Sequence, residues 1–126
     1  AAGFFRDIDA VMPVPIHWTK RLRRGYNQSD FIARGIADVT GLPVLHNLKA
    51  RRAHATQTRK SASERRQPLT GIFAVSHPER LKGKHILLVD DVITTGATIL
   101  SCAQTLKKAV DDHRLSILSL GATKLT

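Results

Sequence analysis

Cysteine, aromatic residues and acidic residues are all scarce in this chain of 126 residues. Cys102 is the only cysteine, which excludes an internal disulfide and a zinc site built from several cysteines. A single thiol also fits a reducing compartment, so we expect a cytoplasmic protein. No apolar run approaches the ~20 residues that span a bilayer, and no charged and apolar leader opens the chain. We therefore expect neither a membrane partner nor a signal peptide.

Basic residues outnumber acidic ones, with 20 Lys and Arg against 10 Asp and Glu and a formal net charge of +10. Such a charge predicts an anionic partner, which is a nucleic acid, a polyphosphate or an acidic surface. Aromatic residues make up only 5% of the chain, which leaves little for a platform that stacks nucleic-acid bases. Charge by itself does not separate these partners from a domain that is merely basic.

Apolar spacing predicts two amphipathic helices. The first follows Asn27, a favourable N-cap residue, and presents Ile32, Ile36 and Val39 on one face before it ends at Gly41. The second contains four apolar residues at helical spacing. These are Ile99, Ala103, Leu106 and Val110.

Strands are expected between and around these helices. They cover residues 8–14, 43–45, 72–75, 85–89 and 115–120. Pro13 and Pro15 keep the first strand short. The strand over residues 85–89 is continuously apolar, as in a parallel strand that is covered on both faces, and Asp90 and Asp91 are expected to end it. We predict an α/β fold in which residues 1–126 form a single domain with a parallel-sheet core and flanking helices.

The stretch from residue 46 to residue 70 has almost no apolar side chains, and its basic residues face one acid, Glu64. A loop of this length in a compact domain is usually a functional lid or a disordered segment. A capping-box pattern at Ser61 predicts one short helix within it, up to Gln67.

Residues 86–98 carry the pattern that points to chemistry. Asp90 and Asp91 come at the carboxyl end of a buried strand, where open α/β sheets bind ligands. The small-residue turn that follows opens a helix, so its backbone amides converge on an anion. Its residues are Thr94, Thr95, Gly96, Ala97 and Thr98. The carboxylates can accept hydrogen bonds from a sugar diol or hold Mg²⁺ through water, so the pattern suggests a ribose 5-phosphate.

Three other interpretations compete with this one. A purely structural acid pair is disfavoured, because adjacent carboxylates at a buried strand end repel each other without a ligand or metal. A receiver domain also carries two acids after its first strand, but too few residues follow Asp91 to complete that domain. A nucleotide hydrolase needs a phosphate-binding Gly-x-x-x-x-Gly-Lys-[Ser/Thr] loop, which the chain does not contain.

The segment Ile-Leu-Leu-Val-Asp-Asp-Val-Ile-Thr-Thr-Gly-Ala-Thr over residues 86–98 resembles the phosphoribosyl pyrophosphate (PRPP) signature of type I phosphoribosyltransferases. Residues 13–17, residues 21–28 and the pair Thr56-Gln57 narrow the resemblance to the ComF family of competence proteins, including its GntX-like members. Members of that family commonly carry an N-terminal module with four cysteines that bind zinc. Because the module is absent, we expect a fragment or a shorter relative. Pro68 stands where the family pattern has an asparagine.

The resemblance implies a small hood over the sheet and a role for each matched segment. Asp90 and Asp91 would bind the ribose hydroxyls and, through water, Mg²⁺, and residues 94–98 would bind the 5′-phosphate. Two sets of basic residues would receive the pyrophosphate, one after the first strand and one in a mobile lid. They are Arg21, Arg23 and Arg24 in the first set, and Arg51, Arg52, Arg59 and Lys60 in the second.

The implied reaction is transfer of the phosphoribosyl group from PRPP to an acceptor that the sequence does not identify, with release of pyrophosphate. Two alternatives stay open. One is a PRPP-sensing regulator without catalysis on the same fold, and the other is a nucleic-acid-binding accessory factor for DNA uptake. The sequence also leaves open whether the chain forms a homodimer and whether it binds a protein of the competence machinery.

Overall fold

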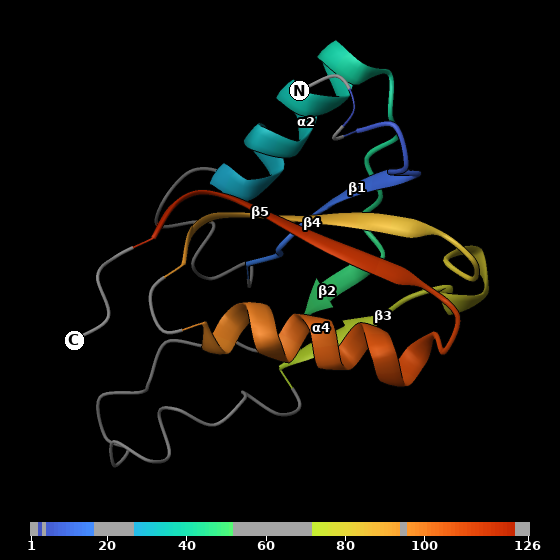
Figure 1. Ribbon diagram of the computed structural model, residues 1–126. Helices are drawn as coiled ribbons and strands as arrows, with labels where there is room; N and C mark the ends of the chain where they lie inside the picture. Colours follow the sequence, from blue (N-terminus) through green and yellow to red (C-terminus); the bar gives the residue numbers. More distant parts are fainter. Residues whose placement is uncertain (1–2, 4, 17–26, 52–71, 94–95, 123–126) are drawn as a thin grey trace, which may run out of the picture.

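The computed structural model describes residues 3, 5–16, 27–51, 72–93 and 96–122. Three parallel strands form the central sheet in the order β1 (Ala10–Pro13), β4 (His85–Ile93), β5 (Arg114–Ala122). Helix α2 (Gln28–Thr40) covers one face of this sheet and helix α4 (Ala97–Ala109) covers the other (Figure 1). The predicted α/β fold with a parallel core and flanking helices is confirmed.

Alternate residues of β4 supply the two faces of the sheet. Ile86 and Leu88 belong to the apolar cluster on the α4 side, whereas Leu87 and Val89 belong to the cluster on the α2 side. All four side chains are fully buried. The run is apolar throughout for the predicted reason: a strand with a helix on each face exposes neither set of side chains to water.

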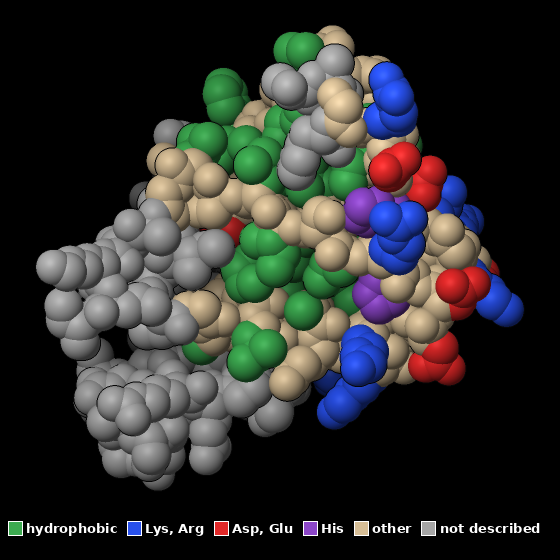
Figure 2. All heavy atoms as spheres, viewed as in Figure 1, with side chains coloured by type: hydrophobic (Ala, Val, Ile, Leu, Met, Phe, Trp, Pro, Cys, Tyr) green, Lys and Arg blue, Asp and Glu red, His purple; other side chains and the backbone are tan. Residues whose placement is uncertain are grey.

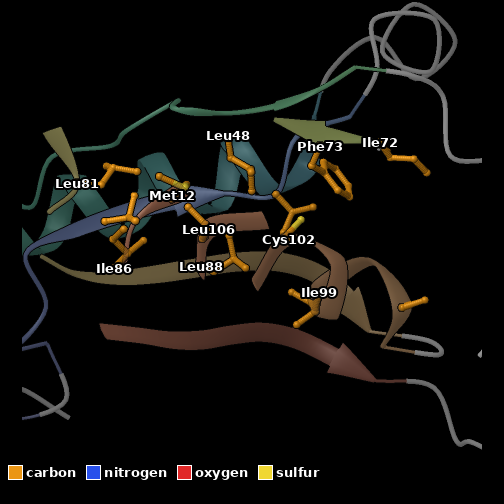
Figure 3. Close-up of a cluster of buried hydrophobic side chains, with 13 residues drawn as sticks. Met12, Leu48, Ile72, Phe73, Leu81, Ile86, Leu88, Ile99, Cys102 and Leu106 are labelled. Atoms are coloured by element: carbon orange, nitrogen blue, oxygen red, sulfur yellow. The ribbon is translucent and has the colours of Figure 1, made fainter. Parts of the chain in front are cut away.

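A two-stranded antiparallel sheet closes the α4 side. It pairs β2 (Leu48–Ala50) with β3 (Phe73–Val75), and Leu48 and Phe73 pack with Leu106 and Cys102 of α4 (Figure 3). Strand β3 was predicted. The prediction of an unbroken loop from residue 46 was wrong at β2, because this short strand forms through pairing with residues far along the chain and buries a single large apolar side chain.

Helix α2 begins and ends where the sequence predicts. The Asn27 side chain accepts a hydrogen bond from the backbone N–H of Ser29, and Gly41 adopts a left-handed conformation with a φ of 80°. Ile32 packs on the core, but Val39 is 87% exposed, so its predicted place on the buried face was wrong. Val39 lies in the last turn of α2, and spacing along a helix does not reveal how far the neighbouring elements extend.

Strand β4 does not stop at the two aspartates, contrary to the prediction. It continues to Ile93, and Asp90 pairs with Ser119 of β5. An acidic side chain does not prevent its own backbone from joining a ladder. Strand β1 ends earlier, with Pro13 opposite Val89, so from Asp90 onward β4 pairs with no strand on its β1 side among the described residues.

The remaining predictions in the fold concern short segments. The strand expected at residues 43–45 is a single parallel bridge between Val44 and Val11, and the connector before β4 contains one 3₁₀ turn, η1 (Pro78–Arg80). The helix predicted over residues 61–67 lies outside the described residues. Within the described residues, neither α2 nor α4 has the length and apolar character that crossing a membrane requires.

Candidate functional site

The two aspartates lie at the carboxyl end of the central strand, just beyond the end of β1. Asp90 is 8% exposed and Asp91 is half-buried. On the face shown in Figure 2, the described lysine and arginine side chains lie toward the opposite, amino-terminal ends of the strands. The fold thus places the predicted acid pair at the edge where parallel sheets bind ligands.

Asp90 is the more perturbed carboxyl group of the two. Burial, followed by the hydrogen bond and the negative charge of the Asp91 side chain, raises the pKa of Asp90 to about 6. The backbone N–H of Asp91 and the hydroxyl of Ser29 act in the opposite direction, because they donate to the ionised form. At neutral pH the site therefore holds a buried negative charge beside a second carboxylate. A cation or a pair of hydroxyl donors would reduce both the desolvation cost of Asp90 and its repulsion from Asp91.

One oxygen of Asp90 receives the hydrogen bonds that fix this side chain. The backbone N–H of Asp91 donates to Oδ1 at 2.9 Å, and Oγ of Ser29, in the first turn of α2, donates to the same oxygen at 3.4 Å. On the far side, the Ser119 hydroxyl donates to the backbone oxygen of Asp91 at 3.3 Å. Strand β4 thus presents its acids between α2 and β5.

The predicted phosphate loop is described only in part. Thr94 and Thr95 lie outside the described residues. Gly96 has a φ of 84° and is the N-cap residue of α4, Ala97 is buried, and Thr98 is half-buried. An added Cβ at Gly96 would meet no atom within 4 Å, so it is the left-handed conformation that requires glycine here. Helix α4 begins at Ala97, so Ala97 and Thr98 of the predicted turn belong to its first helical turn.

Most of the predicted basic residues fall outside the described part of the chain. They are Arg21, Arg23, Arg24, Arg52, Arg59 and Lys60. Arg51 is described, is exposed, and follows β2 directly. Its backbone N–H donates to the backbone oxygen of Ile72, which extends the β2–β3 ladder by one step. The segment predicted as a lid therefore starts from a strand end.

The sequence pattern reveals neither the contact of Ser29 with Asp90 nor the second hydrogen bond of the Asn27 side chain. The Asn27 side chain caps α2 and also donates from Nδ2 to the backbone oxygen of Val14 at 3.1 Å, which ties the helix start to the end of β1. Ser29 is only 3% exposed. No local pattern marks it, because its partner Asp90 lies 61 residues away.

The donor set at this edge suits Mg²⁺ only in company with a ligand. Magnesium takes carboxylate oxygens and usually keeps waters and substrate phosphates as its other ligands. Asp90 and Asp91 could supply the carboxylate oxygens, and the phosphates would have to come from a bound ligand. Within the described residues, no group of three or more His, Cys, Asp or Glu side chains could hold an ion by itself.

Two kinds of comparison place the chain among known proteins. The sequence model of the family described as phosphoribosyl transferase domain matches residues 22–111. Competence protein F of Haemophilus influenzae is 40% identical over 103 residues, which cover 79% of this chain and 44% of that protein. The DNA utilization protein YhgH of Salmonella typhi is 37% identical over 99 residues, covering 78% and 43%. The chain thus spans less than half the length of these relatives.

A solved structure shares the fold. The glutamine PRPP amidotransferase of B. subtilis, in a complex with ADP and GMP, superposes with a TM-score of 0.52 at 22% identity and covers 86% of this chain and 22% of that one. The resemblance drawn from residues 86–98 is therefore confirmed by the family match and by the fold. The chain belongs to the phosphoribosyl transferase domain family.

Proposed function

We propose that this chain binds PRPP at the carboxyl end of β4 and transfers its phosphoribosyl group to an acceptor. The observation that carries the proposal is the pair Asp90 and Asp91, placed beyond the end of β1 and followed by the left-handed Gly96 at the start of α4. A diol site and an anion site would then lie at the same end of the sheet, as the binding of a ribose 5-phosphate requires.

The acid pair would hold the sugar. Carboxylates accept hydrogen bonds from the 2′- and 3′-hydroxyls, and these donors offset the cost of a buried charge on Asp90. Mg²⁺ would be held by Asp90 and Asp91 through water, together with the phosphates of PRPP, and when bound it would neutralise part of the charge on the pyrophosphate.

The phosphates would be bound at the two ends of the sugar. Backbone amides at the start of α4 and the hydroxyls of Thr94, Thr95 and Thr98 would donate to the 5′-phosphate. Two sets of basic residues are proposed for the pyrophosphate, and the composition of the chain supports both. They are Arg21, Arg23 and Arg24, and Arg51, Arg52, Arg59 and Lys60.

The chemical step would exchange substituents at the anomeric carbon. The bond from C1 to the pyrophosphate oxygen breaks with its electron pair going to that oxygen, the bond to the acceptor nucleophile forms, and the proton of the nucleophile passes to water. Glycosyl transfer of this kind passes through an oxocarbenium-like transition state, which basic groups at the leaving pyrophosphate favour.

Titration calorimetry with PRPP and Mg²⁺ tests the binding. We expect saturable binding by the wild-type chain and none by the double variant Asp90→Asn/Asp91→Asn. The matched control is Asp111→Asn/Asp112→Asn, which removes two adjacent acids after α4, at the other end of the sheet. Equal affinity of both double variants would show that the site is assigned to the wrong residues.

A screen of nucleobases and amines for pyrophosphate release then separates catalysis from sensing. Release that depends on an acceptor and on Asp90 supports a transferase. Tight PRPP binding without release from any acceptor would favour the regulator that does not catalyse.

The biological setting follows from the relatives alone. Proteins named for competence and for DNA utilization match most of this chain, so we propose a role linked to DNA uptake. Direct contact with DNA is the second candidate, and the net charge of +10 favours it. It predicts single-strand binding that weakens steeply as salt rises, whereas a domain that acts only on PRPP would bind no DNA at moderate salt.

A further inference from the structure

Ser29 is a buried serine that does not use its own helix as a hydrogen-bond acceptor. Helical hydroxyls usually bond to the carbonyl four residues back, and here the hydroxyls of Thr40 and Thr105 do so at 2.7 and 2.8 Å. Ser29 stands at the second position of α2, so the residue four places back precedes the helix. Its Oγ reaches out of the helix instead and donates to Oδ1 of Asp90.

The backbone around Ser29 is held in place from two sides. Oδ1 of Asn27 accepts the N–H of Ser29 at 3.0 Å, and Nδ2 of Asn27 donates to the backbone oxygen of Val14 at 3.1 Å. The N–H of Val14 in turn donates to the backbone oxygen of Val89 at 2.8 Å. A continuous set of hydrogen bonds therefore links the start of α2 to the residue that precedes Asp90.

The two hydrogen bonds to Oδ1 fix how the Asp90 carboxylate is turned. One comes from the N–H of Asp91 along the strand at 2.9 Å, and the other comes from Ser29 across the helix face at 3.4 Å. The second distance is long for a hydroxyl and a carboxylate. Hydrogen bonds of a site without its substrate are often long and tighten when the substrate binds.

We propose that Ser29 is a positioning residue for Asp90, whose hydroxyl holds that carboxylate in the orientation that accepts the ribose diol. This inference rests on the proposed function, because it assumes that the acid pair binds a sugar. Ser29 itself does not touch the sugar. Its loss should therefore weaken the contribution of the diol to binding and leave the contribution of the phosphate unchanged.

Two sugar phosphates separate these contributions. Ribose 5-phosphate carries the diol, and 2,3-dideoxyribose 5-phosphate lacks both hydroxyls while keeping the phosphate. Calorimetry in Mg²⁺ buffer gives the ratio of the two affinities for each variant. We expect Ser29→Ala to lower this ratio by about five- to tenfold, the range set by the loss of one hydrogen bond that orients a charged group.

Three further variants make the result specific. Ser29→Thr keeps a hydroxyl and should restore most of the ratio, whereas Ser29→Cys, a weak donor of similar size, should not. Ser116→Ala is the matched control, because the Ser116 hydroxyl lies 2.7 Å from Nε2 of His85 at the other end of the sheet. It should leave the ratio at the wild-type value. If Ser29→Ala does not fold, the comparison of Thr with Cys decides.

Two outcomes would overturn different statements. An unchanged ratio in Ser29→Ala, or a Thr variant that matches Cys, would overturn the role of Ser29 and leave the acid-pair site intact. A wild-type chain that binds both sugar phosphates equally would overturn the proposed diol site itself, and the role of Ser29 with it.

Discussion

Asp90 combines burial with charge, and these two properties oppose each other in the protein without ligand. Its side chain is 8% exposed, and a second carboxyl group follows it in the sequence. A raised pKa is the physical consequence, since burial penalises only the ionised form. An aspartate that served the fold alone would be expected to have partners that lower its pKa.

Replacement of Asp90 by asparagine should stabilise the protein without ligand at neutral pH. The folded-state pKa of about 6 lies above the unfolded value, so the wild-type chain loses stability as the pH rises from about 4 to about 6. An asparagine at this position would carry no charge, and its side-chain oxygen could still accept from Ser29. Urea unfolding should show the advantage of Asp90→Asn growing by about 2 kcal/mol between pH 4 and pH 7.

The control for this experiment is Asp111→Asn, which removes an exposed acid far from the site. Its effect on the free energy of unfolding should show no such growth over the same range. If the difference in the free energy of unfolding between Asp90→Asn and wild type stayed constant with pH, the pKa of Asp90 would not be raised in the folded protein.

Cys102 should be inert toward thiol reagents in the native protein. It is fully buried in α4, and burial followed by the negative charge of Asp90 raises the pKa of its thiol well above the usual range. The thiolate is the reactive form, so Cys102 should react only when the fold opens. An aromatic disulfide reagent should label one thiol per chain promptly in concentrated urea and only slowly in buffer. Prompt labelling in buffer would contradict the burial of α4.

At the scale of elements, α2 is defined by its ends as much as by its apolar face. Asn27 caps its start and Gly41 its end, and the first turn contacts both β1 and β4. The helix therefore has two tasks, which are to cover one face of the sheet and to carry Ser29 to the acid pair.

Two glycines, one inside α2 and one that ends it, should respond in opposite ways to replacement by alanine. Gly35 lies exposed inside the helix with no atom within 4 Å of an added Cβ, so Gly35→Ala should stabilise the fold by roughly 0.5–1 kcal/mol. Gly41 has a φ of 80°, so Gly41→Ala should destabilise it by about 1 kcal/mol. Urea unfolding measures both, and each variant is the control for the other. The same sign for both would contradict the assigned end of the helix.

At the scale of the whole molecule, the site and the fold share residues, so ligand binding and stability are linked. A ligand that binds only the folded state adds about 2.7 kcal/mol at a concentration one hundred times its dissociation constant. Burial of the charged Asp90 lowers the stability of the unliganded chain, and under the proposed function PRPP binding would offset that cost.

The stability order of wild type and Asp90→Asn should therefore reverse with ligand. In buffer at pH 7 the variant should melt at the higher temperature. In PRPP and Mg²⁺ far above the wild-type dissociation constant, the wild-type chain should melt higher, because it alone gains the binding energy. Scanning calorimetry of both chains with and without PRPP provides the test. An unchanged order in saturating PRPP would contradict the role of Asp90 in binding.

Features that depend on neighbours along the chain could be predicted from the amino-acid sequence. Helix α2 was predicted to within a residue at each end, because capping by Asn27 and the left-handed Gly41 are local effects. The buried strand before Asp90 was equally visible, since only a strand covered on both faces is apolar throughout. The acid pair and Gly96 directly follow this apolar run, so their place at the carboxyl end of the sheet could also be predicted.

Features that depend on pairing between distant segments emerged only in the folded chain. Strand β2 forms because residues 48–50 meet residues 73–75, and β4 runs past Asp90 because β5 continues to pair with it. Val39 is exposed, although its spacing matches the buried face of α2. Ser29 reaches a carboxylate that lies 61 residues away. Contacts of this kind are set by where each element ends in space, and the periodicity of a single segment carries no record of that position.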